Sequence, residues 1–310
     1  MNARVEKTAW ARDYQAGDAA GVSALFRAVY GDYYVYPDVY LPSQIERRNR
    51  SGQWLSAVAL RGDQLVGHAA LWRDPARPGQ AELALNAVHP DARGLGIATL
   101  LGRHLIDAAK GLGLALITIK QVCSHPQSQY VAQSLGFHTT ALLLDYVASP
   151  FGKPEPESIV LGCLPLRARA LPALDWPAAW RDWLRPLVQT FGENAAPSAA
   201  QLPSELSLAR HGQRLEIHLD SPSAARIDEI AALPANQLLY LTLALSAEAL
   251  SLADALASHG FRFCGLLPDA RLGWRLLWLR GQGPSPEHFC DARAEQLCEL
   301  GETALTAGKA

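Results

Sequence analysis

The sequence has no long hydrophobic run and no excess of either charge, and each absence narrows the range of functions. Its longest apolar stretch, from Leu238 to Ala247, ends at Glu248 and is too short to cross a bilayer. That stretch predicts a buried strand followed by the start of a helix. The formal net charge is only -2, which gives no general attraction to nucleic acid or to an anionic membrane. We therefore expect a small or specific partner, and neither nucleic acid nor membrane.

The sequence also lacks any cysteine pattern that is typical of a metal site or a disulfide framework. Its five cysteines are odd in number and show neither a CxxC pair nor Cys/His ligand spacing. Free thiols in a reducing cytosol are the simple interpretation, and no metal is expected. The N-terminal stretch from Met1 to Tyr14 has no apolar signal core. These features together predict a cytoplasmic protein.

The length of 310 residues is enough for two domains of ordinary size, each with its own core. Three prolines among polar residues in 150–156 predict a loop before a last strand of the first domain, at 159–164. We therefore expect an N-terminal domain over residues 1–166 and a C-terminal domain over residues 167–310.

A strand, a glycine-rich turn and a helix follow one another near the middle of the first domain. Residues 83–88 have the apolar bias of a buried strand, Pro90 ends it, and the run Arg93-Gly94-Leu95-Gly96-Ile97-Ala98 opens an apolar-faced helix. Glycines let a backbone come close to a ligand, and the unpaired N–H groups of a helix's first turn attract an anion. The turn therefore predicts a pyrophosphate site; a structural turn without a ligand is the alternative.

Two other phosphate-binding turns fit this stretch poorly. A P-loop needs Gly-Lys-Ser/Thr, whereas Ile97 and Ala98 follow Gly96 here. A dinucleotide fingerprint needs a third small residue where Thr99 stands, and an acidic residue after the next strand, which ends instead at Lys120 and a glutamine.

The stretch resembles the acyl-CoA motif of the GNAT family of N-acetyltransferases. The resemblance rests on a strand ending in Val88-His89-Pro90, on the run 93–98, and on Gly136-Phe137 about 40 residues later. Two strands predicted at 54–61 and 65–73 feed this turn, as in a GNAT sheet. The resemblance implies an α/β (α+β) fold of the GNAT type, with a mixed, mostly antiparallel sheet whose central parallel strands splay apart between flanking helices.

The same resemblance implies an acyl-CoA-dependent N-acyltransferase. Acetyl-CoA, or another acyl-CoA, would be the cosubstrate, and a primary amine of a small molecule or peptide would attack its thioester directly. Backbone N–H groups near Ala87 and Val88 would hold the pantetheine and polarise the carbonyl. The amides expected to bind the pyrophosphate are those of Arg93, Gly94, Leu95, Gly96, Ile97, Ala98 and Thr99.

Two residues are candidates for proton transfer, each with a structural alternative. Glu82 lies on the fourth strand where many family members carry a base, or it is a solvated carboxylate. The family's usual acid, a tyrosine four residues before the Gly of Gly-Phe, is replaced by Ala132, and Tyr130 should face another side of the helix. His125 would lie near the thioester sulfur and exchange a proton there, or it braces the turn before Pro126.

The acceptor pocket is expected near a cluster of tyrosines after the first helix. Five of the eleven residues in 30–40 are tyrosines, and Tyr33, Tyr34 and Tyr36 would offer flat apolar walls with hydroxyl groups. An aromatic plug over the core is the alternative interpretation.

The C-terminal half repeats part of this pattern. The segment QSLGFHTTALLL from Gln133 resembles ASHGFRFCGLLP from Ala257, and a strand and a helix precede both at equal spacing. No glycine-rich turn occurs between Leu215 and Gln237. We therefore expect two tandem GNAT-like lobes, the second degenerate. A non-catalytic acyl-CoA-binding or regulatory protein, or a scaffold that binds neither ligand, remains an alternative, and both monomer and homodimer are open.

Overall fold

The structure is a computed structural model that describes residues 8–195, 206–269, 273–283 and 289–307. In the N-terminal half the strands and helices are β1 (Trp10–Asp13), η1 (Ala16–Asp18), α1 (Ala19–Tyr30), η2 (Pro37–Tyr40), α2 (Pro42–Arg50), β2 (Trp54–Arg61), β3 (Gln64–Arg73), β4 (Gln80–Val88), η3 (Pro90–Ala92), α3 (Ile97–Gly111), β5 (Leu116–Val122), α4 (Gln127–Ser134), β6 (His138–Val147) and β7 (Glu157–Pro165). In the C-terminal half they are β8 (Leu171–Ala173), η4 (Ala178–Trp180), α5 (Arg181–Phe191), β9 (Glu193–Ala195), β10 (Leu206–His211), β11 (Arg214–Leu219), α6 (Ala224–Ala231), β12 (Leu238–Ala244), α7 (Ala247–Ser251), α8 (Ala253–Ser258), β13 (Arg262–Asp269), β14 (Gly273–Arg280) and α9 (Ala292–Ala307).

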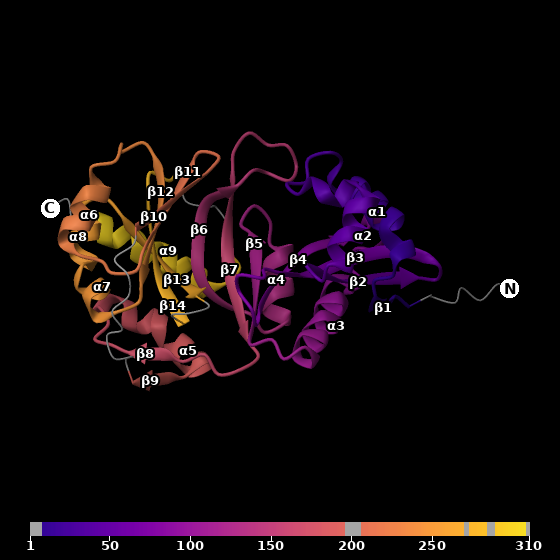
Figure 1. Ribbon diagram of the computed structural model, residues 1–310, viewed down its shortest axis with the longest axis horizontal. Coiled ribbons are helices and arrows are strands. Elements are labelled where there is room, and N and C mark those ends of the chain that lie inside the picture. The colour runs from indigo at the N-terminus through magenta and orange to yellow at the C-terminus, as the bar shows by residue number, and fades with distance from the viewer. Residues whose placement is uncertain (1–7, 196–205, 270–272, 284–288, 308–310) are drawn as a thin grey trace.

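Among the described residues, one sheet of twelve strands runs through both halves. Figure 1 shows its strands side by side across the molecule. Its order is β1-β2-β3-β4-β5-β7-β6-β13-β14-β12-β11-β10, and only the pairs β4/β5 and β11/β12 are parallel. The predicted mixed, mostly antiparallel α/β sheet is therefore confirmed. A separate pair of short strands, β8 and β9, lies beside α5.

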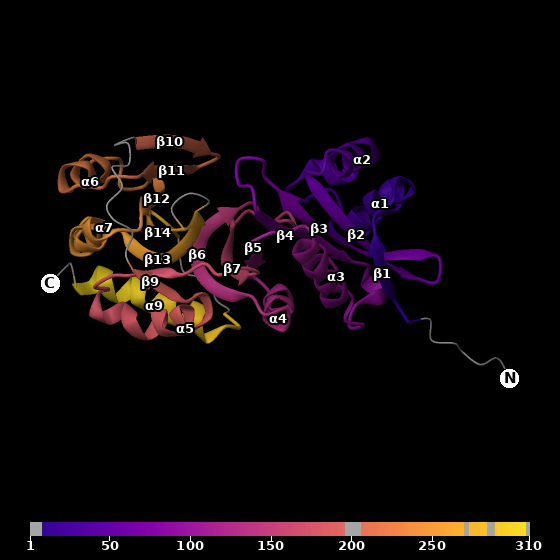
Figure 2. The same ribbon diagram turned by 60° about the horizontal axis from the view of Figure 1, so that its bottom comes forward.

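Helices cover both faces of the sheet in the N-terminal half (Figure 2). The apolar side of α3 buries Leu101 and Leu105 in a cluster with Leu83 and Ile117 of the central strands. On the other face α1 buries residues such as Phe26 in a second cluster. Both helices are amphipathic, with apolar residues three or four positions apart, so each contributes one stripe to the core. The glycine-rich turn lies where α3 begins, with Gly96 as the N-cap residue of the helix.

The two halves meet at strands β6 and β13. These strands are antiparallel neighbours through the pair Ala141 and Gly265, and α9 packs on both of them. Apolar residues of β6 and β7 belong to the same buried cluster as those of β11 to β14. The core of the C-terminal half thus continues into β6 and β7, whereas the two clusters around α3 and α1 lie wholly in the N-terminal half.

The predicted elements agree closely with the structure where the sequence pattern was local. The strand predicted at 54–61 has those limits, and the apolar stretch after residue 238 forms β12 followed by α7. The expected N-terminal domain begins at residue 1, but residues 1–7 lie outside the described residues, and β1 covers residues 10–13. Within the described part of the chain no helix is long and apolar enough to cross a membrane.

Candidate active site

The glycine-rich turn forms an open backbone cradle at the start of α3. Gly94 and Gly96 have φ values of 76° and 71°, in the left-handed region that glycine adopts without strain. A Cβ added at either position would meet no atom within 4 Å. Gly96 is the N-cap of α3, and no side chain caps that end of the helix. The first-turn amides are therefore available to an anion, and the turn fits the pyrophosphate of acetyl-CoA.

Strands β4 and β5 separate next to this turn. Their parallel pairing covers four positions and stops at Leu83 and Ile119, although β4 continues to Val88. Leu85 has a φ of 55°, and the register between β3 and β4 shifts at this point. Ala87 and Val88 stay paired with β3, so the opposite edge of β4 lies beside the gap. An arm such as pantetheine could enter between the two strands there.

Side chains from four segments surround the end of this gap. The Tyr30 hydroxyl donates a hydrogen bond to the Asn86 carbonyl of β4 at 3.2 Å. The Phe151 ring lies 5.5 Å from the Tyr30 ring and 6.3 Å from the His125 ring, centre to centre. The positive charge of Arg93, in the turn, acts on both Tyr30 and His125. A hydroxyl, an imidazole and a guanidinium are thus gathered at the place expected for the thioester.

Burial shifts the pKa values of two of these groups, the Tyr30 hydroxyl and the His125 imidazole. Burial raises the pKa of Tyr30 to about 12, and nearby Arg93 opposes the shift. Burial lowers the pKa of His125 below its ordinary value, although the carboxylate of Glu157 acts in the opposite direction. At neutral pH Tyr30 is therefore a protonated hydroxyl and His125 a neutral imidazole. His125 Nδ1 is buried without a hydrogen-bond partner among the described residues.

Glu82 lies on β4 before the gap, on the side of the tyrosine cluster, in an ion pair. Its carboxylate is 2.9 Å from Lys120 Nζ, and about a quarter of each side chain is exposed. Burial alone would lower the pKa of Lys120, but Glu82 and the two tyrosines Tyr146 and Tyr36 outweigh it, so the pKa is raised. Glu82 is thus a half-buried, paired carboxylate one position before the strands part.

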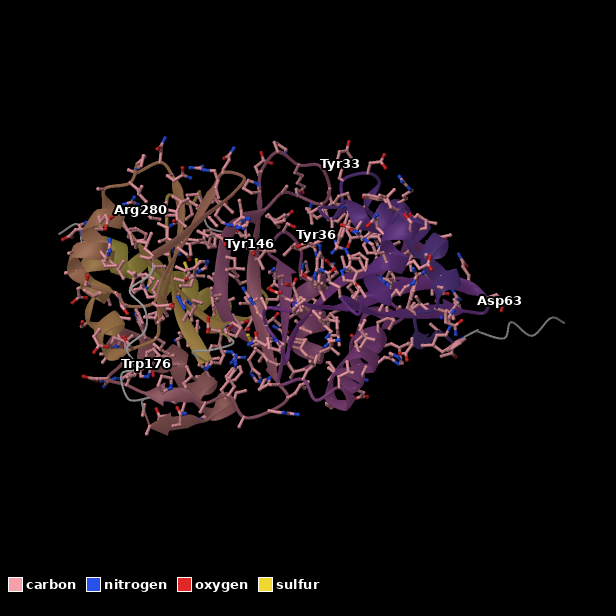
Figure 3. All side chains as sticks on the ribbon, in the orientation of Figure 1. Tyr33, Tyr36, Asp63, Tyr146, Trp176 and Arg280 are labelled. Carbon is pink, nitrogen blue, oxygen red and sulfur yellow. The ribbon has the colours of Figure 1, made fainter. Side chains whose placement is uncertain are left out.

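The three predicted tyrosines do not share one environment. Tyr36 packs against Trp72 at 5.0 Å between ring centres, and Tyr34 lies between Tyr30 and Tyr36. Tyr33 points outward and is 63% exposed, with its ring near Gly152. Figure 3 shows Tyr36 at the junction of the two halves and Tyr33 at the periphery.

The helix after β5 offers no tyrosine to the gap. Ala132 is buried at the position of the family's usual acid, whereas Tyr130 is 59% exposed on another side of α4. Thr99 is in the first turn of α3, and its hydroxyl is 3.1 Å from that of Ser134 at the end of α4. Thr99 therefore links the two helices that flank the turn.

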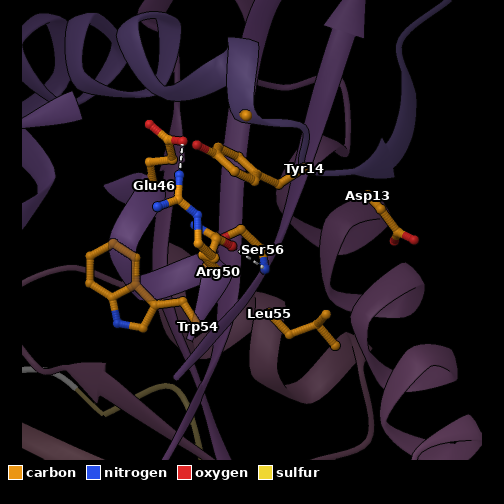
Figure 4. A pocket seen from close by; sticks show the side chains of 9 residues that line it. Asp13, Tyr14, Glu46, Arg50, Trp54, Leu55 and Ser56 are labelled. Carbon is orange, nitrogen blue, oxygen red and sulfur yellow. Dashed lines mark hydrogen bonds and ion pairs between the residues drawn. The ribbon is translucent and has the colours of Figure 1, made fainter. Parts of the chain in front are cut away.

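A cleft of about 760 Å³ lies between the two halves and contains Glu82, Lys120 and Tyr36. Its other wall is formed by strands of the C-terminal half, among them β11 and β12. A second pocket, of about 480 Å³, lies between α2 and strands β1 and β2 (Figure 4). No residue of β4, β5 or the glycine-rich turn lines that second pocket, so the cleft between the halves is the candidate acceptor site.

Sequence reasoning missed several residues of this site. Lys120 was read only as the end of a strand, and Phe151 only as part of a loop. Tyr146, whose ring lies 5.3 Å from Lys120 Nζ, carries no motif. Their roles depend on strand pairing and loop packing, which a motif does not encode. Lys120 lies two residues after Thr118, which is the partner of Glu82 in β5, and therefore on the same face of the sheet.

Comparison with known proteins agrees with this geometry. Residues 21–137 match the model described as the acetyltransferase (GNAT) family. The N-terminal half therefore contains an acetyltransferase domain. It is a domain of the GNAT family, which uses acetyl-CoA as its cosubstrate, and no cluster of three or more metal-binding side chains occurs among the residues described.

Several solved structures are similar to about half of the chain. A ribosomal-protein-alanine N-acetyltransferase from Brucella melitensis is 24% identical over 50% of this chain and 99% of its own, with a TM-score of 0.43. A phosphinothricin acetyltransferase from Sinorhizobium meliloti, solved with acetyl-CoA, is 24% identical over 52% and 89%, with a TM-score of 0.44. The ribosomal-protein-S18-alanine N-acetyltransferase from Escherichia coli is 18% identical over 51% and 94%, with a TM-score of 0.43. No curated protein matched the chain.

Proposed function

We propose that the protein is an acetyl-CoA-dependent N-acetyltransferase with one working site, in residues 1–166, and that residues 167–310 are a GNAT-like lobe without a CoA site. The observation that carries the proposal is the coincidence of an uncapped, glycine-lined helix start with a gap between two parallel strands. The first accommodates a pyrophosphate and the second an extended arm, and acetyl-CoA has both.

The equivalent region of the C-terminal half supports this division. Strands β11 and β12 are parallel, as β4 and β5 are, but they stay paired over all six residues of β11. The following helix, α6, is capped by Ser223, whose hydroxyl accepts a hydrogen bond from the Arg226 amide. A closed strand pair and a capped helix leave no room for pantetheine or pyrophosphate there.

The reaction proposed at the N-terminal site is direct transfer. Acetyl-CoA supplies the activated acetyl group, and the acceptor nitrogen forms a bond to the acetyl carbon while the C–S bond breaks and its electrons leave with sulfur. Glu82 would take the amine proton, directly or through one water, and Lys120 would hold its carboxylate in place. Tyr30, a protonated hydroxyl, would give a proton to the leaving thiolate, and the neutral imidazole of His125 would lie beside it.

A second function is favoured by two observations. Ala132 occupies the position of the usual acid, and Glu82 is already paired with Lys120. Both are compatible with a protein that binds an acyl-CoA and signals to a partner without transfer. Transfer of acetyl groups distinguishes the two functions. We expect amine-dependent release of CoA from the wild type and a loss of at least tenfold in kcat for Glu82→Gln, with acetyl-CoA affinity unchanged.

The first test is calorimetric titration of acetyl-CoA into the wild type and into Gly96→Glu. The new carboxylate would occupy the open space over the turn and repel the pyrophosphate, so we expect binding to weaken by at least tenfold. Gly212→Glu is a matched control, because Gly212 also has a left-handed φ and open space around its Cβ position, but lies in the β10–β11 turn. Equal affinity in the two variants would contradict the assignment of the turn. Wild-type protein that binds no acetyl-CoA would overturn the proposed function.

A further inference from the structure

Each charged side chain that lines the cleft between the halves already forms an ion pair with a side chain of opposite charge. Eight charged residues line it, and each is within 4 Å of an opposite charge. The three closest pairs are Glu82 with Lys120 at 2.9 Å, Glu216 with Arg214 at 2.7 Å, and Asp220 with Arg275 at 2.5 Å. The remaining contacts are Asp74 with Arg77 at 3.8 Å and Asp269 with Arg275 at 3.7 Å. A ligand with a fixed charge away from its amine would have to compete with these pairs.

The groups with unused hydrogen-bonding capacity in the cleft are neutral. The hydroxyls of Tyr36, Tyr146 and Ser207 and the Nε2 atom of His218 line it and have no hydrogen-bond partner among the described residues. Tyr36 and Ser207 come from opposite walls, one from the N-terminal half and one from β10. Figure 3 shows Tyr36 and Tyr146 at the junction of the two halves. Neutral donors and acceptors are thus available on both sides of a ligand.

His218 presents an acceptor to the cleft. Its Nδ1 is 2.5 Å from the Thr242 hydroxyl, which in turn donates to the Ile217 carbonyl at 3.4 Å. Nδ1 therefore carries the proton and donates to Thr242, and Nε2 is left as an acceptor. Burial lowers the pKa of His218, and the charge of Arg275 acts in the same direction, so the ring is neutral at neutral pH.

Aromatic rings provide flat surfaces beside these polar groups. Tyr36 and Trp72 are in contact on the N-terminal wall, at 5.0 Å between ring centres. Tyr146 and Tyr240 are in contact at 5.9 Å on the other side, where Tyr240 is buried and the Arg214 guanidinium lies 4.0 Å from the centre of the Tyr146 ring. Flat rings next to neutral hydrogen-bonding groups suit the C–H face and the hydroxyl edge of a polyhydroxylated ring.

We propose that the acceptor amine binds in this cleft between both halves, and that apart from its amine it is an uncharged, hydroxyl-rich small molecule of the amino-sugar type. The inference rests on the proposed function and gives the C-terminal half a role in it. The amine lies at Glu82, and hydroxyl groups of the acceptor bond to Tyr146, Ser207 and His218. The second half thus recognises the acceptor instead of binding CoA.

The test compares acceptor classes in a CoA-release assay at saturating acetyl-CoA. Glucosamine and an amino-disaccharide represent the proposed class, and spermidine, lysine and phenylethylamine represent cationic, zwitterionic and apolar amines. We expect kcat/KM to be at least tenfold higher for the amino sugars, because each neutral hydrogen bond to the ligand contributes roughly a factor of ten in affinity. A preference for any of the other three would overturn the proposed class.

Variants of the second half test where the acceptor binds. His218→Ala and Ser207→Ala should each raise the KM for the amino sugar about tenfold while the affinity for acetyl-CoA, measured by calorimetry, stays the same. His259→Ala is the control, since His259 pairs with Asp228 on the exterior at 3.0 Å and is outside the cleft. Ser207 is exposed on the last strand of the sheet, so its variant is expected to fold even where the histidine variant fails.

The outcomes separate this inference from the proposed function. An unchanged KM in both cleft variants would overturn the role of the second half, although transfer itself would stand. Acetyl-CoA binding without transfer to any amino sugar would overturn the acceptor class. Absence of acetyl-CoA binding would overturn the proposed function as a whole.

Discussion

His68 is the residue that holds the bend in strand β4. Its Nδ1 donates a hydrogen bond to the Leu85 carbonyl at 2.9 Å, and the side chain is completely buried. Leu85 has a left-handed φ of 55°, which costs a non-glycine residue about 1–2 kcal/mol. The hydrogen bond and the surrounding core therefore maintain a strained residue. That residue lies where β4 turns away from β5, so His68 acts on the site through backbone shape.

The buried histidine should make the stability of the protein depend on pH. Burial lowers the pKa of His68 from 6.5 to about 4, so between those values the unfolded chain binds a proton that the folded chain does not. The free energy of unfolding is therefore complete above pH 6.5 and falls as the pH decreases toward 4, by about 3 kcal/mol. Urea unfolding of the wild type and of His68→Gln at pH 7, 6, 5 and 4 measures the difference. Parallel pH dependences in the two proteins would contradict it.

At the scale of elements, the glycine that joins the two halves has no room for a side chain. Gly265 of β13 pairs with Ala141 of β6 and has a φ of 108°. A Cβ at this position would lie 2.2 Å from the Thr140 carbonyl oxygen and 2.7 Å from the Ala141 Cα. Both contacts are with backbone, which cannot rotate away as a side chain can. The approach of the two halves is therefore possible only with glycine here.

We expect Gly265→Ala to destabilise the protein by about 3 kcal/mol or more, from backbone strain together with the clash across the junction. Gly212→Ala is the matched control. It has a φ of 61° and no atom within 4 Å of the added Cβ, so it should cost only about 1–2 kcal/mol, the strain alone. Denaturant unfolding of the three proteins gives both values. Equal losses in the two variants would show that the junction tolerates a side chain.

Elements whose pattern is local were predictable from the sequence, and contacts between distant segments were not. Pro42 at the first helical position favours the start of α2, and the short, mostly apolar run in 54–61 favours a buried strand, β2, without help from the rest of the chain. The bend at Leu85 depends on pairing with β3 and on a buried histidine, and an ordinary leucine gives no sign of it. The motif likewise indicated the turn at Gly94 and Gly96, but the assembly of one sheet from both halves depends on a pairing between distant strands.

The whole molecule has the same strand order on both sides of its centre. Counted outward from the junction, β6-β7-β5-β4-β3 corresponds to β13-β14-β12-β11-β10, and each corresponding pair is parallel or antiparallel alike. We infer that the second half takes the place that a second subunit would have beside β6. At the junction, buried apolar residues of both halves pack in one cluster, and α9 packs on both β6 and β13.

This arrangement predicts a monomer, because the surface beside β6 is already occupied within one chain. The two outer strands of the sheet also carry charged residues that discourage pairing between copies, such as Arg12 and Asp13 on β1 and Arg210 on β10. Sedimentation equilibrium at several micromolar concentrations should give a mass near 33.5 kDa, independent of concentration. Twice that mass would contradict the prediction, and it would mean that a surface other than the β6 edge joins two copies.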